Sequence, residues 1–114
     1  MDSVSATALS GLFANEQRIR NAAVNVANAQ SENFRPQDIV QSTDATGGVT
    51  ARAVERAPAT FPAVGADGNV AERPNVDVAQ EIVEAQVASY NAQANLRVLQ
   101  TQNRVDQFLL DIQA

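Results

Sequence analysis

The chain has 114 residues, a formal net charge of -5 and neither Cys nor His, and all eight of its cations are Arg. These absences exclude a disulfide framework, a thiolate zinc site, an imidazole base, a Schiff-base lysine and a Walker-type phosphate loop, which needs Lys. An acidic chain with dispersed Arg is also a poor match for a nucleic-acid-binding protein.

Residues 1–30 are predicted to form a helix. Asp2, Ser3 and Ser5 are candidate N-caps for it. Gly11 costs about 1 kcal/mol relative to Ala inside a helix, and it is either a tolerated flaw or a point where a neighbouring backbone approaches closely. A seven-residue repeat predicts a helix-packing seam. The seam consists of Leu12, Ile19 and Val26, with Ala8, Asn15, Ala22 and Ala29 between them.

The same segment bears on localisation. Residues 1–12 have neither the basic region nor the continuous apolar region of a cleavable signal peptide. No apolar run in the chain approaches the roughly 20 residues that span a bilayer. We therefore expect a protein that stays in the cytosol or leaves it without losing a signal peptide.

Residues 31–75 contain all four Pro and four of the five Gly, and we expect a short irregular or β-hairpin insert there. Residues 39–42 and 49–54 flank the turn-rich stretch 43–48, which predicts a hairpin. Residues 57–74 are predicted to be an extended linker with a turn at Asp67-Gly68-Asn69.

Residues 76–114 contain neither Gly nor Pro and predict a second helix. Asp77 is a good N-cap candidate. A helix over 77–112 would be roughly 50 Å long, too long for the insert to cover, so its partners must be the first helix and other chains. Its main apolar row follows steps of three and four. This row consists of Val83, Val87, Tyr90, Ala94, Val98, Thr101, Val105, Phe108 and Ile112, and beside it lie Val78, Ile82, Ala85, Ala92, Leu96 and Leu99.

Together these elements predict a mainly α fold. Long N- and C-terminal helices form an antiparallel, coiled-coil-like hairpin, and the short insert joins them. With 21 Ala and 14 Val against 6 Leu, 4 Ile and 4 Phe, a conventional core would be thin, but small side chains let helices approach closely.

No constellation in the sequence predicts catalysis, a metal site or a cofactor. The densest acidic group is Asp77, Glu81 and Glu84, which we interpret as a solvated face that compensates the helix dipole. Asn and Gln are numerous in both predicted helices. Amides form hydrogen bonds without the desolvation penalty of charge, so they suit a helix that meets several neighbours, although a solvated face would also explain them.

Two motifs at the ends of the predicted helices resemble those of the bacterial flagellar basal-body rod protein family. The first is Asn25-Val26-Ala27-Asn28 followed by Asn33-Phe34-Arg35, and the second begins at Asn75-Val76-Asp77 and continues through Tyr90 and Asn95. Relatives usually have Gly in place of Asn33, and Asn is the next residue best suited to a positive φ. The short insert is most similar to that of the small proximal-rod members.

The resemblance implies a structural role and no cofactor. Residues 1–30 and 76–114 would be the helices of a rod core, with 31–75 as the insert between them. The chain would polymerise through these helices into a torque-transmitting shaft in the periplasm, exported by the flagellar type III apparatus without signal cleavage. Its partners would be its own copies, other rod proteins and the export apparatus or inner ring, not nucleic acid or a small-molecule substrate. The residues expected at helix interfaces are Leu12, Ile19, Val26, Val83, Val87, Tyr90, Val98, Val105, Phe108 and Ile112.

The residues alone leave another class of function open. A free-standing helical adaptor or regulator that forms a small closed bundle oligomer would have the same two helices. An enzyme would need convergent carboxylates in a deep pocket, which the sequence does not predict.

Overall fold

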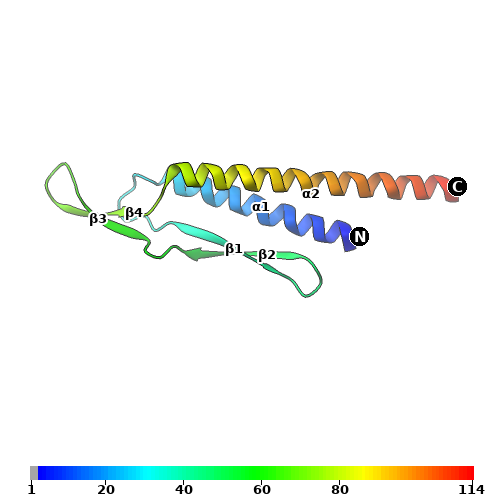
Figure 1. The fold of residues 1–114 in the computed structure, drawn as a ribbon, viewed down its shortest axis with the longest axis horizontal. Helices are drawn as coiled ribbons and strands as arrows, with labels where there is room; N and C mark the ends of the chain where they lie inside the picture. Colours follow the sequence, from blue (N-terminus) through cyan, green and yellow to red (C-terminus); the bar gives the residue numbers. More distant parts are fainter. Residues whose placement is uncertain (1–2) are drawn as a thin grey trace.

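The computed structural model describes residues 3–114 and is an elongated body of 76 × 24 × 14 Å. Two long helices run antiparallel, and two β-hairpins lie between them in the sequence (Figure 1). The elements in chain order are α1 (Ser3–Ala27), β1 (Gln37–Thr43), β2 (Val49–Glu55), β3 (Thr60–Val64), β4 (Val70–Pro74) and α2 (Val78–Gln113).

The helix termini follow the local sequence signals. Asp77 is the N-cap of α2, and its carboxylate accepts hydrogen bonds from the backbone N–H groups of Ala79 and Gln80 at 3.1 and 3.3 Å. The predicted cap is therefore confirmed, and it satisfies two of the donors that a helix start leaves unpaired. Of the three cap candidates for α1, Ser3 and Ser5 lie inside the helix and Asp2 lies outside the described residues.

The contact between the two helices is built from small and polar residues. Within the described parts of the two helices, the buried apolar side chains are all Ala. Ala8, Asn15 and Ala22 are buried as the seven-residue repeat predicted, whereas Leu12, Ile19 and Val26 in the adjoining row are only half-buried. The buried residues of the two helices are Ser5, Ala8, Gly11, Ala14, Asn15, Ala22 and Asn25 of α1, and Glu81 and Ala88 of α2.

Gly11 lies against the side chain of Asn95 on α2. A Cβ atom built on Gly11 would lie 2.8 Å from Nδ2 of Asn95, which is too short for an unstrained contact. Close approach is thus the reason for this glycine, although a side chain of α2 makes the contact and not a neighbouring backbone.

The insert contains two hairpins. β1 pairs with β2 antiparallel, from Gln37 opposite Glu55 to Thr43 opposite Val49, which confirms the predicted hairpin. The extended linker predicted over residues 57–74 is wrong, because β3 and β4 form a second antiparallel pair there. A proline is tolerated at Pro62 because each strand of a two-stranded sheet has a free edge, where no backbone N–H is needed.

The two hairpins lie in different places relative to the helices. β1 and β2 contact α1 on the side away from α2, so α1 is the middle layer (Figure 1). In the part of the chain that the structure describes, β3 and β4 pack against no helix or other strand, and this hairpin extends beyond the ends of the helices. The turn predicted at residues 67–69 closes it, with Gly68 at a φ of 82°.

Candidate functional site

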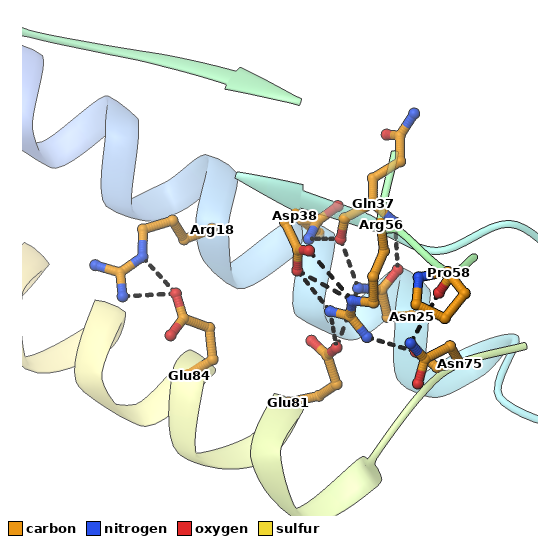
Figure 2. Close-up of polar contacts among 10 residues, drawn as sticks. Arg18, Asn25, Gln37, Asp38, Arg56, Pro58, Asn75, Glu81 and Glu84 are labelled. Atoms are coloured by element: carbon orange, nitrogen blue, oxygen red, sulfur yellow. Dashed lines mark hydrogen bonds and ion pairs between the residues drawn. The ribbon is translucent and has the colours of Figure 1, made fainter. Parts of the chain in front are cut away.

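A polar junction joins both helices to the insert, and its centre is Arg56 (Figure 2). Arg56 follows β2, and its Nη2 donates to Oδ1 of Asp38 at 2.6 Å and to Oε1 of Glu81 at 2.7 Å. Its Nη1 donates to the backbone carbonyl of Asn75 at 2.6 Å. One guanidinium therefore binds the first strand, the segment before α2 and the first turn of α2 together.

The two carboxylates differ in exposure. The side chain of Asp38 is 51% exposed and that of Glu81 only 5% exposed. The hydrogen bond with Asp38 is the largest cause that raises the pKa of Arg56, burial opposes it, and the hydrogen bond with Glu81 raises the pKa further. The buried Glu81 is nevertheless the partner that depends on Arg56 more, because water solvates a carboxylate that is 5% exposed less well than one that is 51% exposed.

Asn25 of α1 completes the junction. Its side chain is almost fully buried at 1% exposure, and its Nδ2 donates to the backbone carbonyl of Gln37 at 2.9 Å and to Oε1 of Glu81 at 3.3 Å. Its Oδ1 accepts from the backbone N–H of Gln37 at 3.4 Å. Asn25 thus connects α1, β1 and α2, and no buried polar side-chain atom among the described residues lacks a hydrogen-bond partner.

A second ion pair lies one helical turn along the same interface. Arg18 of α1 contacts Glu84 of α2 at 2.6 Å and also donates to Oδ1 of Asn15 at 3.1 Å. An open groove of about 560 Å³ lies between this pair and the junction, lined by residues of both helices and β1. The solvated face expected at the start of α2 is therefore wrong for Glu81, which is buried, whereas Asp77 and Glu84 are exposed. Asp77 also caps the helix, and Glu84 is paired across the interface.

The first family motif forms the exit from α1. Nδ2 of Asn28 donates to the carbonyl of Val24 at 2.9 Å, so it satisfies a carbonyl of the last turn, whereas Asn25 lies in the polar junction. Asn33 has a φ of 64°, which confirms that Asn takes the conformation suited to Gly. Phe34 and Val26 are half-buried and Ala27 is exposed.

Arg35 ends the first motif with a bidentate pair to Glu55 at 2.7 and 2.9 Å. Hydrogen bonding within this pair raises the pKa of Arg35 and lowers that of Glu55. The exit of the chain from α1 is thereby connected to the end of β2.

The second family motif begins in the junction and continues along α2. Nδ2 of Asn75 donates to the carbonyl of Pro58 at 2.8 Å, and Val76 is half-buried beside it. Asn95 lies against Gly11 in the helix interface, and Tyr90 is 70% exposed on the opposite part of α2. The sequence interpretation missed Arg56 and Asp38, because only the path of the chain through the insert brings these charges to the helices. It also missed Arg18 of α1, because the alignment of the two helices brings it to Glu84.

The large apolar side chains of α2 form an exposed stripe along nearly the whole helix. Within the chain the stripe lies away from α1, and its members are between 42% and 70% exposed. These are the α2 residues expected at a helix interface, and their contact with other subunits stays a prediction. The apolar stripe consists of Val83, Val87, Tyr90, Val98, Val105, Phe108 and Ile112.

Residues 3–114 contain neither an acidic metal-binding cluster nor a membrane-spanning helix. None of the described residues form a cluster of acidic side chains that could hold a metal ion. None of the described helices is long and apolar enough to cross a membrane.

Curated proteins with a known role are similar to this chain in sequence. The flagellar basal-body rod protein FlgC of Salmonella typhimurium is 37% identical over 111 residues, which cover 81% of this chain and 82% of the relative. The FlgC of Salmonella typhi has the same identity and coverage, and that of Escherichia coli O6:H1 is 36% identical over 110 residues with the same coverage. No family model matches the chain.

Proposed function

This chain belongs to the family of flagellar basal-body rod proteins, and from that premise we propose that it polymerises through its terminal helices into the shaft of the proximal rod. These relatives confirm the resemblance of the chain to this family, and the protein is a structural component of the basal body, not an enzyme. How it assembles and what load it carries are the proposal.

The apolar stripe of α2 is the observation that carries the proposal. Seven large apolar side chains stay 42–70% exposed along one side of a 36-residue helix. Contiguous exposed apolar surface on this scale marks an interaction surface. Helices of neighbouring subunits are the natural partners, because a second helix lying along α2 would cover the stripe over its whole length.

The contact between α1 and α2 supports coiled-coil-like packing within the subunit. Half-buried and buried positions of α2 follow one another at steps of four and three, which is the spacing of a coiled-coil seam. These positions are Glu81, Ala85, Ala88, Ala92, Asn95, Leu99 and Gln102, and Ser89 beside Ala88 is the other half-buried residue of α2. Small residues in the seam keep the helix pair slender, so several pairs can gather around one axis.

The polar junction supports a role in torque transmission. A shaft that carries torque needs each subunit to resist bending where its parts join. Arg56 and Asn25 connect α1, α2 and β1 through short hydrogen bonds, so the insert and the helix pair turn together. We infer that the insert contacts the adjoining layer of rod or inner-ring protein in the periplasm. Before assembly, the subunit would be exported through the flagellar type III apparatus without signal cleavage.

Val98→Asp tests the assembly surface. Val98 is 42% exposed within the chain, so the carboxylate stays solvated in the free subunit and its fold survives. In an assembly the same charge would be buried against a neighbour, at several kcal/mol. We expect unchanged circular dichroism of the purified subunit but lost incorporation into basal bodies and lost motility.

Gln100→Asp is the matched control for this substitution. Gln100 is exposed on the side of α2 away from the stripe, so the same charge there should leave incorporation and motility intact. Wild-type motility of the Val98→Asp strain would show that the stripe is not the assembly surface.

Hydrogen exchange distinguishes the rod subunit from a closed adaptor bundle. Ordering each helical residue opposes folding by about 1–2 kcal/mol of backbone entropy, and a seam of Ala residues recovers little of it. We expect weaker protection of residues 77–112 in dilute protein than in assembled rods. Strong protection of this range in a monomer or small closed oligomer would favour the adaptor.

A further inference from the structure

Two hollows follow one another along the same side of α1, and we call them together the cleft. The first is the groove of about 560 Å³ beside the polar junction, and the second holds about 310 Å³. Residues of α2 and of β1 line both hollows. The α1 residues of the cleft follow steps of three and four, so they lie on one side of the helix and span about 21 Å at 1.5 Å per residue. These residues are Thr7, Gly11, Asn15, Arg18 and Asn21.

The outer edge of β1 has unused backbone groups. At the two ends of the hairpin, the N–H of Asp44 donates to the carbonyl of Gly48 at 2.7 Å, and that of Arg56 donates to the carbonyl of Pro36 at 3.0 Å. Hydrogen-bonded pairs alternate along an antiparallel ladder. The even-numbered residues of β1 therefore bond to β2, and the odd-numbered residues point their N–H and C=O groups outward.

Gln37 shows where these outward groups point. Its carbonyl accepts a hydrogen bond from Asn25 of α1 at 2.9 Å (Figure 2) and another from Asn21 at 2.8 Å. Further along β1, Ile39 lines the first hollow and Gln41 the second. In the part of the chain that the structure describes, the outward groups of Ile39 and Gln41 bond to no other element. One edge of the sheet is thus open along the cleft.

This edge lacks the residues that protect a strand from pairing with another chain. Proteins commonly place Pro or Lys on exposed edges for that purpose. The β3–β4 hairpin follows this rule with Pro62 and Pro74. β1 contains neither Pro nor Lys, so it can accept a further strand.

Amide side chains line the cleft without a hydrogen-bond partner in the described chain. Gln80 lies in the first hollow, and Gln41, Asn91 and Asn95 lie in the second. A primary amide both donates and accepts, so it matches the N–H and C=O groups of a peptide backbone. These residues therefore suit an extended segment better than a helix, whose backbone groups are already bonded to one another.

The first hollow presents negative charge to its occupant. The side chains of Asp38 and Glu84 are 51% and 48% exposed, whereas those of their partners Arg56 and Arg18 are 19% and 15% exposed. The guanidinium groups therefore lie deeper than the carboxylates, and the accessible surface is acidic. A segment with basic side chains would complement it.

We propose that an extended, basic segment of another basal-body protein lies in the cleft and adds a third strand to the edge of β1. This inference rests on the proposed function, because the partner belongs to the same assembly. About six residues at 3.3 Å each span the 21 Å of the cleft. Backbone hydrogen bonds to Ile39 and Gln41 supply the affinity, and the amide and acidic side chains select the occupant.

Hydrogen exchange of single backbone amides tests the added strand. The amides of Ile39 and Gln41 point outward from β1, and those of Ala53 and Ala51, directly opposite them, point outward from β2. We expect the two β1 amides to exchange at least tenfold more slowly in isolated basal bodies than in the free subunit, and the two β2 amides to change less than threefold. Equal slowing at both edges, or none at β1, would overturn the proposal.

A matched pair of proline variants tests whether assembly needs this edge. Gln41→Pro and Ala53→Pro each remove one outward N–H and leave the ladder between β1 and β2 intact. We expect the two purified variants to have the same circular dichroism. Gln41→Pro should incorporate into basal bodies at least fivefold less than the wild type, and Ala53→Pro should incorporate normally. Equal incorporation of the two variants would contradict the added strand.

Two substitutions of Gln80, which is exposed in the first hollow, test the charge of the occupant. Gln80→Arg should lower incorporation at least threefold by repelling a basic segment, and Gln80→Glu should not. The opposite ranking would show that the occupant is not basic. If the subunit incorporates and the Ile39 and Gln41 amides still exchange rapidly, the added strand is wrong and the proposed function stands. If the wild-type chain is absent from basal bodies, the proposed function fails and this inference fails with it.

Discussion

Replacing Arg56 with Met should be the most destabilising single change in the polar junction. Met keeps the aliphatic volume of the side chain but removes every donor. Glu81, whose side chain is 5% exposed, would keep only the 3.3 Å hydrogen bond from Asn25. A buried carboxylate that loses its cation typically destabilises a fold by 3–5 kcal/mol.

The expected size of the effect lies at the lower end of that range. The side chain of Arg56 is 19% exposed, so water reaches the space that the guanidinium leaves. We expect a loss of about 3 kcal/mol, which lowers the melting temperature by roughly 10–15 °C for a chain of this length. Thermal and urea unfolding followed by circular dichroism at 222 nm would measure it.

Two further variants identify the cause of the loss. Asp38→Asn removes the exposed partner of Arg56 and should cost less than about 1 kcal/mol, as exposed ion pairs do. The double variant Arg56→Met with Glu81→Gln removes the buried charge as well and should recover most of the lost stability. If the double variant is as unstable as Arg56→Met alone, or if Asp38→Asn is equally damaging, buried charge is not the reason that the junction needs Arg56.

The remaining predictions concern the helix interface and the first hairpin turn. Gly11→Ala gains about 1 kcal/mol of helix propensity but places a Cβ against Asn95, so the single variant should have an unchanged or lower free energy of unfolding. The double variant with Asn95→Ala removes the clash, and its free energy of unfolding in urea should be about 1 kcal/mol higher than that of the wild type. A more stable single variant would contradict the close contact. The backbone N–H of Thr46 lowers the pKa of Asp44, so the contribution of Asp44 is full above about pH 4, the ordinary Asp value, and is lost as the pH falls through its depressed pKa. Asp44→Asn keeps an acceptor and should abolish this acid dependence in the amide chemical shift of Thr46, and an unchanged titration there would refute the assignment.

The helices and the first hairpin could be predicted from the sequence because their signals are local. Asp77 predicts where α2 begins, and the spacing of the apolar residues after it predicts a helix with an apolar row. The β3–β4 hairpin was missed because Pro58, Pro62 and Pro74 were interpreted as breaks in structure. Pro62 and Pro74 lie in a two-stranded sheet with free edges, where they cause no break, and Pro58 lies in the loop before β3. Nothing in the spacing of these prolines indicates that.

The polar junction could not be predicted, because its members are far apart in sequence. Asn25 and Glu81 each have an adequate local explanation, as a helix-end amide and as a charge near a helix N-terminus. The structure gives both another role once the insert brings Arg56 between them. Local sequence rules offer an explanation for every polar residue. They therefore cannot show which of these residues form hydrogen bonds or ion pairs with partners far away in the sequence.

The distribution of side-chain size explains why this chain is built to be one part of a larger body. In a self-sufficient bundle the large apolar residues lie in the shared seam, because burying them supplies most of the folding free energy. Here Ala8, Ala22 and Ala88 fill the seam, while Val98 and Phe108 lie outside it at 42% and 65% exposure. The free subunit thus leaves its largest hydrophobic contribution unrealised, and only contact with other helices can recover it. Under the proposed assembly, folding and assembly are coupled, and the stability of α2 should depend on the concentration of its partners.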